Sequence, residues 1–267
     1  MAPRFIRSAI RRIAGHLSFD TALQISKILL HAQGFGSGAD PRKSGEHRVF
    51  ALLNNDRPVL FDVGGHLGGY TAAFLDRFPG GQAYLFEPSA AHMKIVRENL
   101  SAYSNVRYLP YALSDRDGDA ILYKNSPISL IASLTRRRLD HYSVAMDITE
   151  TVECRTIDGI MSDLAVPSID LLKIDVEGHE LAVLRGAQDT IKAGRAPIIQ
   201  FEFGGTHLDT RTTFQDFFYF FSDNNYSLHI IRPRGDLVRI AKYEEALEQY
   251  QTSNFVAILN GHRDNDV

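Results

Sequence analysis

The sequence has very little cysteine, no long apolar run and almost no net charge. Its one cysteine, Cys154, cannot form an internal disulfide, which excludes a disulfide-rich secreted scaffold and favours the reducing cytoplasm. No segment approaches the roughly 20 apolar residues that span a bilayer, and the N-terminus lacks the apolar core of a signal peptide. The net charge of −3 gives no overall basic field, so we expect no nucleic-acid partner.

The chain is nevertheless long and apolar enough to bury a large core. Its 267 residues are 44% hydrophobic and 23% charged, as in an ordinary globular protein. Strand-like and helix-like segments alternate after residue 50, which predicts an α/β domain over residues 51–267. Residues 1–50 are predicted to form an N-terminal helical extension.

The extension begins with a basic amphipathic pattern. Apolar residues recur at near-helical spacing over residues 4–17, with Arg4, Arg7, Arg11 and Arg12 between them. Such a helix can lie on an anionic membrane, here the inner membrane surface, as a peripheral contact. It can equally pack its apolar stripe against the main domain.

A glycine-rich turn follows the first predicted strand of the domain. Residues 58–63 (PVLFDV) form a short apolar run that ends in an acid, GGHLGG follows, and residues 70–78 have helical periodicity. Such a turn lets a ligand approach the backbone and the free N–H groups of a helix. Glu87 ends the next strand, about twenty residues beyond the turn, where a carboxylate can bind two ribose hydroxyls.

The acid before the turn distinguishes between two nucleotide cofactors. S-adenosylmethionine and NAD both fit a glycine turn followed by an acidic strand end. Asp62 would repel a pyrophosphate but suits the ammonium group of an amino acid, and the glycine spacing is not G-x-G-x-x-G. S-adenosylmethionine is therefore favoured. Ser114 and Asp115, after a later strand, are candidates for facing the adenine, although Asp115 also fits ordinary turn chemistry.

The chain contains, in this order, the motifs FDVGGHLGGYT, LFEPS, ALSDRDG, RTIDGI, DLLKIDVEGHELAVLRGA and PIIQFEF. In their order and spacing they resemble the FkbM-type class I S-adenosylmethionine-dependent methyltransferases. Gly65 and His66 stand where the family usually has a small residue and an asparagine. The resemblance implies a doubly wound, seven-stranded, Rossmann-like class I methyltransferase sheet whose last strand is antiparallel. YSLHIIRP and SNFVAILN would form its final hairpin around a helical insert.

The resemblance also implies O-methylation of a hydroxyl group. We expect a sugar acceptor, in a cell-surface glycan or its precursor. The alternatives are a polyketide or other secondary metabolite, an NAD-dependent oxidoreductase on the same fold, and a non-catalytic cofactor-binding subunit. The expected cofactor-binding residues are Asp62, Gly64, Gly65, His66, Gly68, Tyr70, Thr71, Glu87, Pro88, Ser114 and Asp115.

Acidic residues and histidines end two later strands. Asp175 and Glu177 follow one strand and Glu202 ends the next, with His179 and His207 close by. An alcohol acceptor must lose its proton, and three interpretations of these residues stay open. In the first, His179 or His207 is the general base, and the carboxylates orient it or the acceptor. In the second, Asp175, Glu202 and also Glu177 bind Mg²⁺ or another divalent cation. In the third, the acids stabilise a helix N-terminus.

Two further segments are candidates for binding. Arg136–Arg138 can bind a phosphate of the acceptor or form a solvated surface, in a stretch that is expected to cap the substrate. A core stripe at helical spacing is predicted for Phe214, Phe217, Phe218 and Phe221. Tyr219 and Phe220 lie off that stripe, where they can line a sugar-binding surface, form a homodimer contact or be plainly buried.

Overall fold

Short apolar runs form the strands of a large mixed sheet in the computed structural model, which describes residues 4–262. In spatial order the strands are β10 (Leu237–Ile240), β9 (Tyr226–Ile231), β11 (Ser253–Leu259), β8 (Ile198–Phe203), β7 (Leu171–Ile174), β1 (Val59–Val63), β2 (Gln82–Phe86) and β3 (Val106–Leu109). The central strands are almost wholly buried, as parallel strands covered on both faces must be.

The direction of the strands confirms the predicted class I methyltransferase fold. β3, β2, β1, β7 and β8 are parallel neighbours, and β11 runs antiparallel between β8 and β9. The predicted final hairpin therefore forms. An extra edge strand, β10, pairs with β9 and makes eight strands where seven were predicted.

The segment between β9 and β11 differs from its prediction as a helical insert. Within it only η3 (Glu245–Leu247), a short 3-10 helix, is helical. Residues 237–240 instead extend along the exposed edge of β9, because pairing there satisfies backbone groups that the strand would otherwise leave open.

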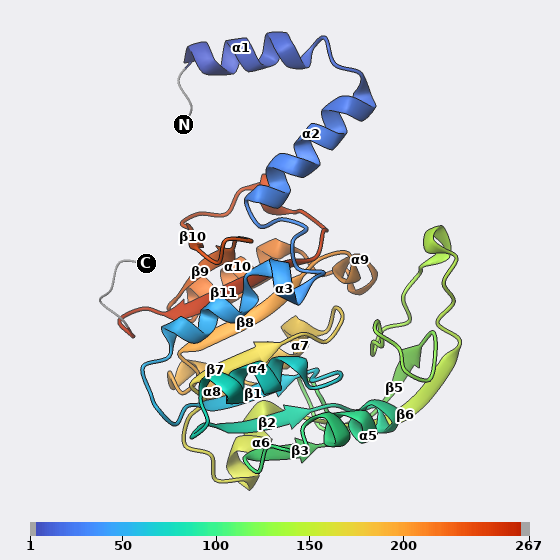
Figure 1. Cartoon of the computed structure of the whole chain (residues 1–267), viewed down its shortest axis with the longest axis vertical. Helices are drawn as coiled ribbons and strands as arrows, with labels where there is room; N and C mark the ends of the chain where they lie inside the picture. The colour runs from blue at the N-terminus through green and yellow to red at the C-terminus, as the bar shows by residue number, and fades with distance from the viewer. Residues whose placement is uncertain (1–3, 263–267) are drawn as a thin grey trace.

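Helices cover both faces of the sheet (Figure 1). Alternate side chains of a strand point to opposite faces: Leu60 belongs to the core cluster that contains Phe50 and Phe74, whereas Phe61 belongs to the cluster that contains Ile160 and Phe217. The first face carries η1 (Glu46–Leu52), α4 (Gly69–Arg77) and α5 (Ala90–Asn99). The second carries α6 (Ile157–Asp163), α7 (Glu180–Arg185), α8 (Gln188–Lys192) and α10 (Phe214–Asp223).

The phenylalanine stripe of α10 is a core stripe, as predicted. Phe214, Phe217 and Phe221 are fully buried, and the ring of Phe217 stacks on that of Phe201 with centroids 4.8 Å apart. Tyr219 is half exposed, so the homodimer contact expected there stays a prediction.

A smaller sheet lies beside the large one (Figure 1). It consists of β4 (Ala112–Leu113), β6 (Ile148–Arg155) and β5 (Gly118–Lys124). Cys154 is buried in it as a small apolar side chain. The long loop of residues 125–147 between β5 and β6, which includes η2 (Asp140–Tyr142), folds back so that Ser133 pairs with Tyr123. We call this loop the cap.

The N-terminal helices stand away from the domain (Figure 1). They are α1 (Arg4–Ala14) and α2 (Phe19–Ala32), and no residue of α2 is buried. The interpretation in which the first helix packs on the domain is therefore not what the structure shows. From Gly34 onward the chain lies on the domain through α3 (Pro41–Ser44) and η1, whose Val49 and Phe50 are buried. The helical part that stands away from the domain thus ends with α2 at Ala32, well before residue 50.

Candidate active site

Two adjoining cavities lie at the carboxyl ends of β1, β2, β7 and β8. This is where open α/β sheets bind ligands. The smaller has a volume of about 150 Å³ and the larger about 900 Å³. Gly64, His66, Asp175 and Glu177 line both cavities, so the two meet at these residues.

The glycine turn holds β1 close to its neighbours. Gly64 has a φ of +84°, and a Cβ atom there would overlap the carbonyl oxygen of Asp175. A Cβ on Gly65 would overlap the side chain of Leu85 on β2. Only glycine permits both the left-handed conformation and the close approach at this point. The glycine turn therefore allows β1, β2 and β7 to pack closely, and it also lines the cavities.

Glu87 lines the smaller cavity and binds backbone groups next to it. Its carboxylate accepts hydrogen bonds from the backbone N–H groups of His66 (3.0 Å) and Ser89 (2.8 Å), and Nδ1 of His92 lies 3.4 Å away. An ionised carboxylate has about four lone-pair sites, so it can still accept from ribose hydroxyls. Pro88 also lines this cavity, whose apolar walls are Val63, Phe86, Tyr111, Leu113, Leu122 and Leu134.

Most of the predicted cofactor residues line one of the cavities. Asp62, Gly65 and Tyr70 line the larger, Glu87 and Pro88 the smaller, and Gly64 and His66 both. The remaining four, Gly68, Thr71, Ser114 and Asp115, line neither.

Three of these four have other contacts. Thr71 donates a hydrogen bond to Asp62 (2.7 Å). The hydroxyl of Ser114 lies 2.9 Å from Nε2 of His179. His179 lines the smaller cavity and Ser114 does not, so Ser114 affects that cavity only by positioning the His179 ring. Asp115 is exposed, which favours the turn chemistry that was its alternative interpretation.

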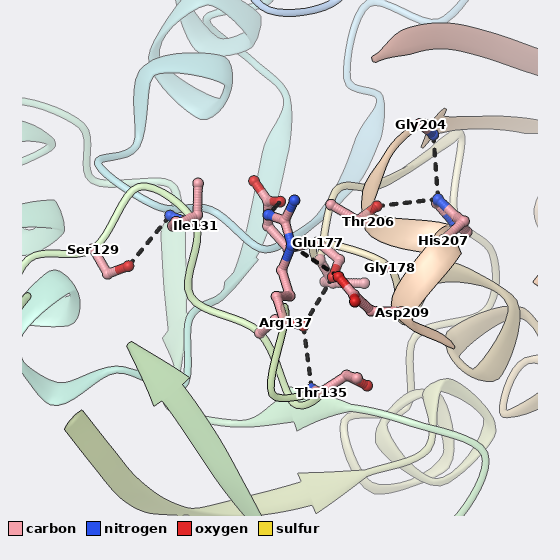
Figure 2. A network of polar contacts seen from close by, with 12 residues as sticks. Ser129, Ile131, Thr135, Arg137, Glu177, Gly178, Gly204, Thr206, His207 and Asp209 are labelled. Atoms are coloured by element: carbon pink, nitrogen blue, oxygen red, sulfur yellow. Dashed lines mark hydrogen bonds and ion pairs between the residues drawn. The ribbon is translucent and has the colours of Figure 1, made fainter. Parts of the chain in front are cut away.

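The two histidines proposed as bases have different surroundings. His179 lines the smaller cavity, and burial lowers its pKa. His207 is fully buried: its Nε2 lies 2.9 Å from Glu180, and its Nδ1 faces the backbone N–H of Gly204 and the hydroxyl of Thr206 (Figure 2). His207 thus contacts Glu180 at the start of α7 and stabilises that turn. A fully buried ring in this position is not compatible with a role as the general base.

The predicted acids do come together. Asp175, Glu177 and Glu202 all line the larger cavity. Burial, with the charge of Asp175, raises the pKa of Glu177 to about 8 although Arg137 opposes the shift. Burial and the charges of Asp175 and Glu177 raise the pKa of Glu202 well above its usual range. Carboxyl groups whose pKa values are raised by burial and by neighbouring charges, in a cleft, indicate a functional site.

Sequence reasoning missed a fourth carboxyl group, Glu46. It begins η1 and lines the larger cavity, and burial raises its pKa to about 7. Its neighbours include Asp62 and Lys173, which are distant in the sequence. Nothing in the local pattern around residue 46 indicates this position, because the loop that carries it has no motif.

Buried cations balance these acids. Lys173 Nζ donates to Asp175 (2.9 Å) and lies 5.1 Å from the centre of the Tyr70 ring. Burial lowers the pKa of Lys173, but the charges of Asp175, Asp62 and Glu46 outweigh it and raise the pKa above its ordinary value. Arg137 of the cap donates to Glu177 (2.9 Å) and lies 3.7 Å from Asp209 (Figure 2).

Arg137 thus differs from its two neighbours in the basic run. Arg136 and Arg138 are exposed and pair with Asp147 and Asp140, as a solvated surface would. Arg137 is mostly buried and ties the cap to the sheet, together with Ser133, whose hydroxyl donates to the carbonyl oxygen of Glu177 (2.8 Å). Glu177 itself has a φ of +56°, a strained backbone of the kind found at functional sites.

The acid cluster does not fit the predicted divalent cation. Within residues 4–262, no three His, Cys, Asp or Glu side chains are arranged to hold a metal ion. Lys173 already neutralises Asp175, and Arg137 already neutralises Glu177. Asp175 and Glu202 are therefore not a metal site in this arrangement, and we derive no step through a metal.

Removing the buried lysine should destabilise the fold strongly. Lys173→Met leaves Asp175, Asp62 and Glu46 without their common cation, and breaking a buried pair costs about 3 to 5 kcal/mol. We expect urea unfolding to show a loss of that size. Lys192→Met, at an exposed lysine of α8, is the control and should change the unfolding free energy by less than about 0.5 kcal/mol. An equal effect of both variants would contradict this account of Lys173.

Comparison with known proteins finds similarity to methyltransferases. The family model described as the methyltransferase FkbM domain matches residues 62–228. The 2-O-methyltransferase NoeI of Sinorhizobium fredii is 32% identical over 162 residues, which are 56% of this chain and 65% of that protein. The hexuronic acid methyltransferase AglP of Haloferax volcanii is 28% identical over 164 residues, 60% of this chain and 64% of that protein.

The chain thus spans less than two thirds of the length of either relative. A crystal structure of methyltransferase FkbM from Methylobacillus flagellatus matches 89% of this chain and 60% of that chain, with 16% identity and a TM-score of 0.47. Because the family model covers more than half of the sequence, the chain belongs to the FkbM methyltransferase family.

Proposed function

We propose that this protein transfers a methyl group from S-adenosylmethionine to a hydroxyl of a sugar, in a cell-surface glycan or its precursor. The observation that carries the proposal is the meeting of two different cavities at Asp175 and Glu177. One has apolar walls and a carboxylate suited to ribose, and the other is lined by acids. The relatives NoeI and AglP, named as a 2-O-methyltransferase and a hexuronic acid methyltransferase, support a sugar acceptor.

The smaller cavity and the glycine turn fit S-adenosylmethionine. The apolar walls suit the adenine, and Glu87 has lone pairs left for the ribose. Asp62 has one buried oxygen, Oδ1, with no hydrogen-bond partner among the described residues, which suits the ammonium end of the cofactor. When bound, S-adenosylmethionine supplies a methyl group activated by a positively charged sulfur.

The larger cavity suits a polyhydroxylated acceptor. Glu46, Glu177 and Glu202 can accept hydrogen bonds from several hydroxyls at once. Glu177 lines both cavities, so it lies where an acceptor hydroxyl would approach the cofactor. Its carboxylate takes the hydroxyl proton as a general base, while the two cavities hold the reactants in line.

Calorimetric titration tests the cofactor. We expect S-adenosylmethionine and S-adenosylhomocysteine to bind, NAD not to bind, and Mg²⁺ to leave both affinities unchanged, because Lys173 and Arg137 already balance the acids. Binding of NAD alone would overturn the methyltransferase proposal. A large gain in affinity with Mg²⁺ would restore the metal interpretation.

A panel of acceptors tests the substrate class. Radioactive methyl transfer is measured to sugar glycosides, including uronic acids, and to polyketide hydroxyls. We expect label in the sugars. Label only in the polyketides would move the function to secondary metabolism, and cofactor binding without transfer to any acceptor would favour a non-catalytic subunit.

A further inference from the structure

The two N-terminal helices expose several large apolar side chains to solvent. Six have exposed fractions between 59% and 80%: Phe5, Ile10, Ile13, Phe19, Ile28 and Leu29. In α2 the polar residues Asp20, Gln24, Lys27 and His31 recur at intervals of four, three and four, which places them on one stripe. The rest of the circumference of α2 is mainly apolar and contacts little of the domain. Contiguous apolar surface of this kind indicates an interaction site.

The charges of α1 indicate what that surface meets. The helix contains four arginines and no acidic residue. Arg11 and Arg12 are exposed, and in the described part of the chain neither forms an ion pair. The whole chain, in contrast, has a net charge of −3. Positive charge is therefore concentrated on the same helix that exposes Phe5, Ile10 and Ile13.

We propose that α1 and α2 form a docking surface for an anionic lipid bilayer. A basic amphipathic helix lies in the interface plane, with its apolar side among the acyl chains and its arginines at the anionic headgroups. The described residues contain no helix that is both long and apolar enough to cross a bilayer. A second copy of the chain is a poorer occupant, because symmetric pairing would bring the arginines of two α1 helices together without acids to balance them.

The segment that joins α2 to the domain lines part of the larger cavity. After α2 the backbone N–H of Gly36 donates to the hydroxyl of Ser253 (2.9 Å), and that of Gly38 donates to the carbonyl oxygen of Thr252 (2.8 Å). Gly38 and the following Ala39 and Pro41 line the larger cavity. Docking of α2 on a bilayer would therefore hold one wall of that cavity within a few residues of the membrane-bound helix.

Co-sedimentation of the full chain with vesicles tests the proposal independently of any methyl transfer. One set of vesicles is phosphatidylcholine alone and the other contains 30% phosphatidylglycerol. We expect binding to the anionic vesicles to be at least tenfold tighter than to the neutral ones and to weaken as salt is added.

Matched charge reversals identify the surface. Arg11→Glu/Arg12→Glu should weaken binding to anionic vesicles at least tenfold, and Ile10→Ser/Ile13→Ser should do the same without changing the charge. Arg107→Glu/Arg116→Glu, at two exposed arginines of the domain, changes the net charge equally and should leave binding intact. Three results would overturn the proposal. They are failure of the protein to bind anionic vesicles, an equal loss of binding in both arginine double variants, and a dimer in light scattering that the Ile10→Ser/Ile13→Ser variant abolishes.

Discussion

Glu177→Gln should lower kcat for methyl transfer by about 100-fold or more, the usual contribution of a general base. Glutamine keeps the size of the side chain and an oxygen that can accept from Arg137, so the cap should stay in place. It removes only the group that takes the proton. Glu177 lines both cavities, as Asp175 does, and burial raises the pKa of Glu177 into the range that suits a general base.

The pH dependence distinguishes a base from a structural acid. A base acts only when it has lost its proton, and burial raises the pKa of Glu177 to about 8. The kcat of the unaltered protein should therefore rise as the pH rises toward about 8 and level off above it. Glu177→Gln should lack this rise and keep its affinity for S-adenosylmethionine. A variant with unchanged kcat, or one that loses cofactor affinity instead, would show that Glu177 is not the base.

A surface acid provides the control for this variant. Glu153 on β6 is exposed, and its closest ion-pair distance is 4.0 Å, to Arg155. Glu153→Gln should leave both kcat and its pH profile unchanged.

Gly64→Ala should abolish cofactor binding and destabilise the fold by about 4 kcal/mol. A left-handed φ costs a residue with a side chain about 1 to 3 kcal/mol, and overpacking adds about 1 to 3 more. The new methyl group would overlap the carbonyl oxygen of Asp175, a backbone atom that cannot rotate away. β1 and β7 would have to separate at the point where the two cavities meet.

Gly69→Ala is the matched control five residues later. A Cβ at Gly69 meets no atom within 4 Å, and the residue is the first of α4. Alanine there should leave the unfolding free energy the same or raise it by up to about 1 kcal/mol. Thermal unfolding and calorimetric titration with S-adenosylhomocysteine measure both variants. Equal behaviour of the two would contradict the close approach described for Gly64.

The sequence predicted the parts of the site that local patterns encode. The turn at residues 64–69 and the acids Glu87 and Asp175 follow strands, Glu202 lies near the end of β8, and the carboxyl ends of parallel strands meet at one edge of the sheet. The convergence of these residues at one edge of the sheet could therefore be predicted from the sequence alone. The roles of Ser114 and His207 could not, because proximity in the chain does not show whether a side chain points into a cavity or into the core.

The contacts that sequence reasoning missed come from segments without periodicity. Glu46, which was not predicted at all, lies in a 3-10 helix after a glycine-rich loop. Arg137 lies in the cap and was a candidate for binding a phosphate of the acceptor, not for pairing with Glu177. Each reaches the site across more than thirty residues of chain, to Lys173 and Glu177 respectively. The edge strand β10 was missed for a related reason, since an edge strand is short, half exposed and weakly patterned.

The attachment of the cap has a consequence for how this protein can acquire new acceptors. The cap lines both cavities, yet the side chains that bind it to the sheet beneath the acceptor are few, chiefly Arg137 and Ser133. The central strands and the glycine turn line both cavities from below, whereas Leu130, Ala132 and Leu134 of the cap form part of the wall of the smaller one. Exchange of residues 125–147 between family members would therefore change the walls of both proposed pockets, so it should alter the choice of acceptor and the affinity for the methyl donor together.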